Sequence, residues 1–288
     1  MGEHSGRERI AKARLLLEGI AAEERADPQV AHGSRWWLHE DVVPTAVVLL
    51  HGLTNSPPQY DVLAPQLHAR GHAVINLRLP YHGYRDRMTD AIVKLRAGDL
   101  EAVALQAVVI GALCGERVVV AGISVGAALA GWLAARTRID LGIAIAPFSG
   151  IRELPAGAND AFGALMRTAP NLFGWWDPRV KQRQPPSHGY PRFSTRALGE
   201  SLLISSEMEK TKSLEHGRRV VLVENANDPV VNNTHADRRF RALQSRGLSY
   251  ERVILCGLPK MHDIVEPAVP QAKPNLVYPK LIDIIETA

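Results

Sequence analysis

The chain has 288 residues, a length that fits one large α/β domain or two small ones. Its composition, 46% hydrophobic and 22% charged, is that of an ordinary globular protein with a sizeable core. The net charge of +4 is mildly basic, and no lysine and arginine cluster is interleaved with aromatic residues, which argues against nucleic-acid binding. Cys114 and Cys256 lie in apolar stretches and predict buried free thiols, as in a cytoplasmic protein.

Residues 1–33 predict a separate N-terminal helical segment. Residues 1–28 mix Arg, Glu and Lys and lack the apolar core of a signal peptide. The longest apolar run, 121–135, is too short to cross a bilayer, so no membrane span is expected. The segment would either pack on the domain, which we favour, or lie on a membrane surface. Four apolar residues fall on one helical face: Ile10, Ala13, Leu17 and Ile20.

Apolar, β-branched runs alternate with helical patterns along the rest of the chain, without hairpin signals between them. This alternation predicts an α/β fold with a mostly parallel central sheet and helices on both faces. Strands are expected at 34–43, 45–50, 72–78, 118–123, 140–146, 218–224 and 251–256, and helices at 57–70, 89–113, 125–135 and 195–216.

One connection is much longer than an ordinary crossover. About seventy residues separate the strand that ends near Ala146 from the strand that begins near Arg218. We predict a core of residues 34–148 and 195–288, with residues 149–194 inserted as a cap over the sheet edge. A structural elaboration with its own small core is the alternative. Three apolar cap residues are candidate substrate contacts, although tryptophans in such a segment more often pack: Met166, Trp175 and Trp176.

The strand at 118–123 runs into Gly-Ile-Ser-Val-Gly, and a small-residue helix follows. This is the G-x-S-x-G pattern in its strand–turn–helix context, where a sharp turn exposes the serine hydroxyl above the sheet. Gly122 and Gly126 are expected because crossing backbones leave no room for a Cβ. Ser124 is therefore the predicted nucleophile.

A serine hydroxyl needs a positioned base, and the base needs an acid that orients it. His262 follows the last predicted strand in a loop, and Asp228 follows the strand before it. The order Ser124, Asp228, His262 is the one expected with this turn. His235 is the alternative base. His68 and His72 have metal-ligand spacing but no third partner, so no metal site is predicted.

Three further stretches carry a family resemblance. Residues 49–57 are similar to the His-Gly oxyanion loop of bacterial carboxylesterases and monoacylglycerol lipases, and residues 77–83 resemble the family's R-x-P-x-H-G turn. Residues 227–231 resemble the loop that carries its acid. With the serine turn, these motifs identify residues 34–288 as resembling the α/β-hydrolase fold family. By position, the resemblance implies an oxyanion hole made by the backbone N–H groups of Leu53 and Val125.

The sequence thus predicts a serine hydrolase that cleaves small-molecule carboxylic esters through an acyl-enzyme, with no cofactor. A C–C hydrolase, thioesterase or amidase would use the same triad, because this fold hosts many chemistries. A non-catalytic binding protein is the alternative from another class. It is disfavoured because all three triad positions are filled.

Overall fold

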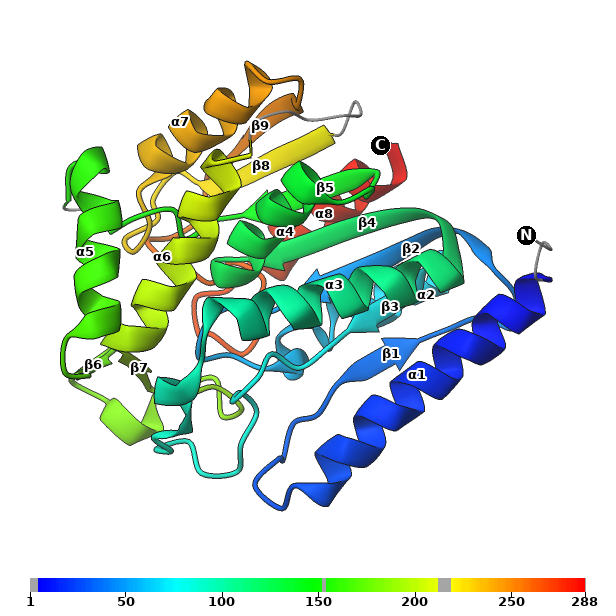
Figure 1. The fold of residues 1–288 in the computed structure, drawn as a ribbon, viewed down its shortest axis with the longest axis horizontal. Helices are drawn as coiled ribbons and strands as arrows, with labels where there is room; N and C mark the ends of the chain where they lie inside the picture. The colour runs from blue at the N-terminus through cyan, green and yellow to red at the C-terminus, as the bar shows by residue number, and fades with distance from the viewer. Residues whose placement is uncertain (1–4, 152–153, 212–218, 288) are drawn as a thin grey trace.

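The protein is described here by a computed structural model that covers residues 5–151, 154–211 and 219–287. Its centre is a seven-stranded sheet in the order β1-β3-β2-β4-β5-β8-β9 (Figure 1). All neighbours pair in parallel except β1, which runs antiparallel to β3. The predicted mostly parallel sheet is confirmed. The strands are β1 Arg35–Trp37, β2 Val43–Leu50, β3 Ala73–Asn76, β4 Gly115–Ile123, β5 Leu141–Ile145, β8 Arg219–Asn225 and β9 Ser249–Leu255.

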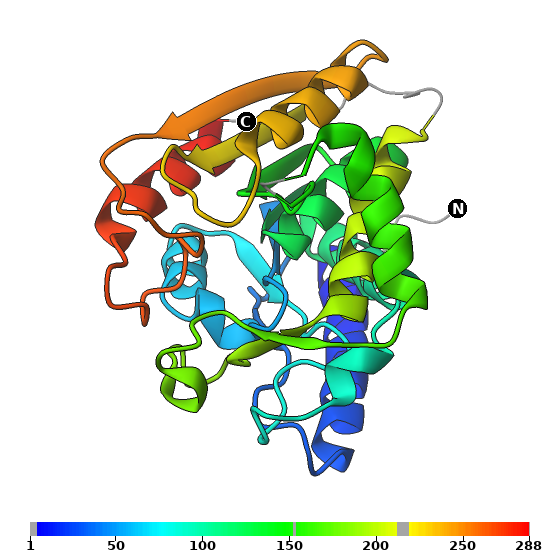
Figure 2. The same ribbon diagram turned by 90° about the vertical axis from the view of Figure 1, so that its left-hand side faces the viewer.

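The central strands are buried on both faces, which explains their continuous apolar runs. In β2, Val48 and Leu50 belong to one buried cluster, whereas Val47 and Leu49 belong to another on the opposite face. The first cluster is covered by α1, α3, α4, α6 and α7, and the second by α2 and α8 (Figures 1 and 2). These helices are α1 Gly6–Ala26, α2 Leu63–Ala69, α3 Ala97–Cys114, α4 Val125–Arg136, α6 Thr195–Glu209, α7 Asn233–Gln244 and α8 Pro274–Thr287.

The N-terminal segment forms the long helix α1, which packs beside α3 (Figure 1). It starts with a capping box in which the Ser5 side chain accepts from the Glu8 amide and the Glu8 side chain accepts from the Ser5 amide. Three residues of the predicted face, Ile10, Ala13 and Leu17, are buried together with Ala21, whereas Ile20 is half-buried against the same core. The amphipathic stripe therefore lies against the domain.

Helix α3 is the one helix in the described ranges that is long and apolar enough, by length and composition, to cross a membrane. It packs against β2, β3 and β4 as well as α1, in the position of a helix that covers a sheet.

Several predicted boundaries are wrong. The helix expected at 57–70 is a 3-10 turn, η1 Pro57–Tyr60, followed by the short α2. The helix expected from residue 89 starts only at Ala97, after the 3-10 turn η2 Ala91–Lys94. Residues 212–216 of the helix expected at 195–216 lie outside the described residues. Cys114 is buried as predicted, but Cys256 is exposed at the end of an edge strand.

The connection between β5 and α6 contains its own secondary structure. It holds α5 Ala156–Thr168, the antiparallel pair β6 Phe173–Trp175 and β7 Arg192–Ser194, and the 3-10 turn η3 Lys181–Arg183. Helix α5 packs along α6. The β6–β7 pair and η3 lie below the sheet in the view of Figure 2. The division into core and cap remains a prediction.

Candidate active site

Ser124 stands on the turn between β4 and α4. Its backbone is left-handed, with φ of 57° and ψ of −110°, a conformation that costs energy in any residue except glycine. Its amide donates to the carbonyl of Ile145 at 2.9 Å, which ties the turn to the end of β5. A Cβ at Gly122 would lie 2.2 Å from the Gly126 oxygen, and one at Gly126 would lie 2.0 Å from the Leu50 oxygen. Crossing backbones therefore impose both glycines.

Asp228 and His262 are brought together from the loops after β8 and β9. His262 Nδ1 lies 2.8 Å from Asp228 Oδ2. The other carboxylate oxygen, Asp228 Oδ1, accepts from the amides of Val230 at 2.8 Å and Val231 at 3.1 Å. These bonds fix the carboxylate, and the carboxylate fixes the ring. The Nδ1–H then faces Asp228, and Nε2 is left as the acceptor.

The two loops are joined by a residue that sequence reasoning missed. The Asn225 side-chain amide donates to the carbonyls of Pro259 at 3.0 Å and Met261 at 2.7 Å. Asn225 is fully buried at the end of β8, where a short amide can reach the neighbouring loop. The asparagine just before the acid motif is the sequence signal that could have found it.

His262 has an altered basicity. Burial alone would lower its pKa, but the charge and hydrogen bond of Asp228, together with the charge of Asp263, outweigh burial and raise the pKa above 6.5. Its Nε2 is buried and has no hydrogen-bond partner within the described residues. Since a buried ring nitrogen is normally paired, this free atom is available to a reacting group.

The loop after β2 is held from the core side. Gly52 N–H donates to Gln59 Oε1 at 2.9 Å, and His51 Nδ1 lies 2.9 Å from Gly52 O. Leu79 N–H donates to His51 Nε2 at 3.1 Å, so Nδ1 carries the proton. Burial lowers the pKa of His51 well below 6.5. His51 is therefore neutral and links the loop after β2 to Leu79.

The predicted oxyanion hole consists of the amide of Leu53, a residue that lines the same cavity as Ser124, and the amide of Val125, which directly follows Ser124 in the chain. Leu53 follows Gly52, and Val125 is the first residue of α4, whose N-terminus carries partial positive charge. Neither amide has an acceptor in the part of the chain that the structure describes. Two free N–H groups beside a serine are the elements of an anion-binding site.

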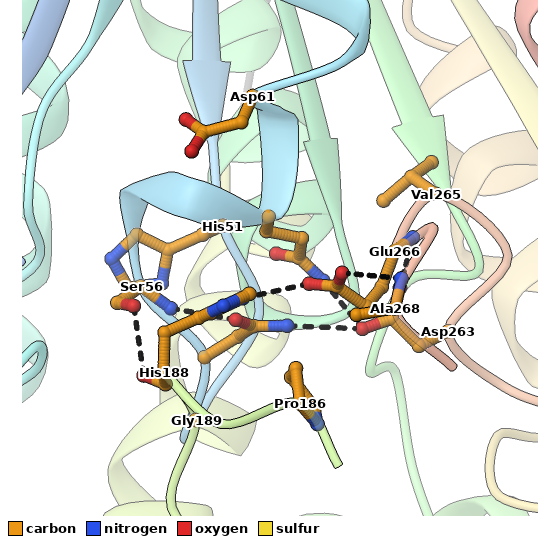
Figure 3. A network of polar contacts seen from close by, with 12 residues as sticks. His51, Ser56, Asp61, Pro186, His188, Gly189, Asp263, Val265, Glu266 and Ala268 are labelled. Atoms are coloured by element: carbon orange, nitrogen blue, oxygen red, sulfur yellow. Dashed lines mark hydrogen bonds and ion pairs between the residues drawn. The ribbon is translucent and has the colours of Figure 1, made fainter. Parts of the chain in front are cut away.

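A second acid, Asp263, lies next to His262 and belongs to a buried polar network (Figure 3). Its carboxylate accepts from Gln59 Nε2 at 2.6 Å and from Asn55 Nδ2 at 3.1 Å. Burial, with the charge of Glu266, raises its pKa to about 6. Glu266 Oε2 in turn lies 2.8 Å from His188 Nε2 of the cap. The sequence places Asp263 beside His262 but does not reveal these partners.

The cavity has a volume of about 530 Å³ and is lined by Ser124 and His262. Its apolar lining includes Leu53, Ile123 and Met261 of the loops and strand that surround Ser124. Residues between 176 and 190 of the inserted segment also line it. Trp176 lines the cavity. Trp175 and Met166 do not belong to the lining, and Met166 is buried in the core against α6.

The remaining histidines considered from sequence have other partners. His68 stacks on His39 with ring centroids 4.2 Å apart. His235 Nδ1 lies 3.2 Å from Asn159 Nδ2, outside the cavity lining. Over the described ranges, no group of three or more His, Cys, Asp or Glu residues is arranged to hold a metal ion.

Comparison with known proteins shows the family of the chain. A family model described as "Alpha/beta hydrolase family" matches residues 47–270, well over half of the chain. The chain belongs to the alpha/beta hydrolase family. The match contains the turn of Ser124 and the loops of Asp228 and His262. A search among curated proteins returns no match.

Three solved structures resemble this chain in fold at low sequence identity. One, from a study of the metagenome-derived lipolytic enzymes LipS and LipT, is 20% identical with a TM-score of 0.68, over 90% of this chain and 100% of the other. A monoacylglycerol lipase of Paleococcus ferrophilus is 18% identical with a TM-score of 0.62, over 85% and 96%. A soluble variant of the Saccharomyces cerevisiae monoglyceride lipase is 13% identical with a TM-score of 0.64, over 88% and 90%. These likenesses establish the shared fold.

Proposed function

We propose that this α/β hydrolase is a serine hydrolase that cleaves carboxylic esters by an acyl-enzyme mechanism. One observation carries the proposal. His262 is bound through Nδ1 to Asp228 at 2.8 Å, while its free Nε2 belongs to a ring that lines the same cavity as Ser124. A serine in a strained turn, a base with a fixed tautomer and a buried acid are the parts that nucleophilic acyl transfer needs.

In the proposed reaction, His262 Nε2 takes the proton of Ser124 Oγ as the oxygen attacks the ester carbonyl. The carbonyl oxygen becomes an oxyanion and accepts from the amides of Leu53 and Val125. The tetrahedral intermediate collapses, and His262 returns the proton to the departing alkoxide. Water, deprotonated by His262, then attacks the acyl carbonyl. As this second tetrahedral intermediate collapses, His262 returns the proton to Ser124 Oγ, and the carboxylic acid leaves. Asp228 stays ionised and stabilises the imidazolium in both steps.

The cavity walls favour an ester with an apolar part. Most of the exposed surface of the lining is apolar, although polar side chains also reach it, and its volume of about 530 Å³ is in the range of small-molecule sites. We therefore propose an aliphatic or aromatic ester of about monoglyceride size as the substrate class.

The test is Ser124→Ala, with a panel of p-nitrophenyl esters of graded chain length. We expect kcat to fall about a millionfold. We also expect a fluorophosphonate probe to label the wild-type protein at Ser124 and to leave the variant unlabelled. A variant that keeps a tenth of wild-type turnover would contradict the assignment.

The same panel separates the alternative reactions. A thioesterase domain of a biosynthetic pathway shares the fold with a TM-score of 0.54 at 17% identity. Labelling of Ser124 without turnover of any ester would favour a thioester, amide or C–C bond as the substrate. Absence of labelling in folded protein would favour a binding protein.

A further inference from the structure

The loop that carries Leu53 contains an unusual backbone. Thr54, the next residue, has a φ of 70°. A β-branched residue in this left-handed region is a true outlier, because its branched side chain crowds the backbone there. Such a conformation persists only when surrounding contacts hold it. The question is which contacts hold Thr54.

Two hydrogen bonds reach Thr54 from the cap. The indole Nε1–H of Trp176 donates to Thr54 Oγ1 at 2.8 Å. The backbone N–H of Tyr190 donates to Thr54 O at 2.6 Å. The chain passes so close that a Cβ on Gly189 would lie 3.2 Å from the same oxygen. Both sides of the Thr54 residue, side chain and carbonyl, are thus held by the segment between β6 and β7.

That cap segment, residues 182–190, is itself fixed to the core. The Arg87 guanidinium donates to the carbonyls of Gly189, Gln184, Pro186 and Gln182 at 2.6, 2.5, 3.0 and 3.1 Å. Tyr190, the last residue of this segment, has two anchoring bonds of its own. The Tyr190 hydroxyl donates to Tyr81 O at 2.9 Å and accepts from Tyr84 N at 3.1 Å.

Ser56 and Glu266 bind the same cap segment at His188. Ser56 Oγ donates to His188 O at 2.9 Å, and His188 Nε2 pairs with Glu266 at 2.8 Å, as Figure 3 shows. These hydrogen bonds to core groups make the segment a rigid support. They argue against a lid that opens freely.

Leu53 lies between two pinned residues. On its N-terminal side, Gly52 is held by Gln59 and His51 of the core. On its C-terminal side, Thr54 is held by Trp176 and Tyr190 of the cap. Fixing both neighbours fixes the peptide plane that carries the Leu53 N–H, and preorganised donors are what stabilise an oxyanion.

We infer that Trp176 is a positioning residue for the oxyanion hole: its indole N–H holds Thr54 in the left-handed conformation that aims the Leu53 amide. This inference rests on the proposed function and deepens it. The role of Trp176 then differs from that of a substrate contact, because a residue that only lines the cavity would affect KM. A positioning residue acts on kcat.

The test removes each end of the hydrogen bond by a single substitution. Trp176→Phe deletes the N–H donor and keeps an aromatic ring against Phe193, whose centroid lies 4.5 Å away. Thr54→Val deletes the acceptor and keeps the β-branch. Trp175→Phe is the matched control, because Trp175 precedes Trp176 but contacts Lys181 and lies outside the cavity lining.

Each variant is assayed for kcat and KM on the best p-nitrophenyl ester, and for inhibition by an alkylboronic acid. The boronic acid forms a tetrahedral adduct on serine and so reports on the oxyanion hole. We expect Trp176→Phe and Thr54→Val each to lower kcat and boronate affinity about three- to tenfold, the usual worth of one hydrogen bond, with KM unchanged. The double variant should match the singles, because both remove one bond. Trp175→Phe should behave as wild type.

Three results would overturn the inference. They are an unchanged kcat in Trp176→Phe, a change confined to KM and to the chain-length profile, or losses that multiply in the double variant. A wild-type protein that labels at Ser124 separates these results from failure of the proposed function. Wild-type protein that neither labels nor turns over any ester refutes the proposed function, and this inference falls with it.

Discussion

The turn of Ser124 allows a specific structural prediction, the effect of adding a single methyl group at Gly126. In Gly126→Ala the new Cβ would lie 2.0 Å from Leu50 O and 2.6 Å from Leu50 C. Normal contact needs more than 3 Å, so β2 and α4 would have to separate by about 1 Å. Both are backbone, and Leu50 is fully buried and paired in the sheet, so neither can move alone.

The expected cost follows from that geometry. Overpacking a close-packed interior destabilises by up to about 3 kcal/mol, and backbone against backbone belongs at the upper end. For a chain of this size, that loss corresponds to a fall in Tm of about 6 °C. A displacement of about 1 Å between Ser124 and the oxyanion loop should also lower kcat about a hundredfold.

The assay pairs thermal unfolding with ester turnover, and Gly19→Ala is the control. Gly19 lies within α1, and an added Cβ there meets nothing within 4 Å. Alanine is the better helix former by about 1 kcal/mol, so this variant should be slightly more stable and fully active. A change in stability of 1 kcal/mol shifts the Tm of such a chain by about 2 °C. The packing argument is therefore wrong if Gly126→Ala melts within about 1 °C of wild type and keeps most of its activity.

Four further outcomes are expected. Asp228→Asn should lower kcat about ten-thousandfold, because the His262 tautomer is lost, and a fall of less than tenfold would refute that role. kcat/KM should decline as pH falls through the raised pKa of His262, above 6.5, because the base must be neutral. Asp263→Asn removes one charge that raises this pKa, so the acidic limb of the pH profile should move to lower pH; an unmoved limb contradicts the coupling. Arg87→Met leaves the cap carbonyls without their donor, so limited proteolysis should cut residues 182–189 faster than in wild type, and equal rates would argue against anchoring.

The strand positions could be predicted from sequence because a doubly covered parallel strand leaves a local signature. The buried run of residues 46–50 is apolar at every position, so its type does not depend on distant residues. Helices were harder to predict. α7 and α8 were missed, and α3 begins later than expected, because helix ends depend on local caps and tertiary packing. The partly apolar surroundings of Cys256 suggested burial, but edge strand β9 leaves it exposed.

The proposed triad was also within reach of sequence reasoning, because chain order and strand ends restrict it. In a parallel sheet the carboxyl ends of neighbouring strands meet at one edge, so residues placed after β4, β8 and β9 converge there. A motif and its spacing were enough to select Ser124, Asp228 and His262 from many candidates.

The amino-acid sequence by itself determined the α/β class, the turn of Ser124 and the residues proposed for acyl transfer. Only the tertiary structure showed how that site is braced. The bond from Trp176 to Thr54 joins residues 122 positions apart, and the bond from Gln59 to Asp263 joins residues 204 apart. Local patterns register which face of an element is buried. They do not predict which distant polar group forms a hydrogen bond with a strained or buried residue, because that pairing exists only once the chain has folded.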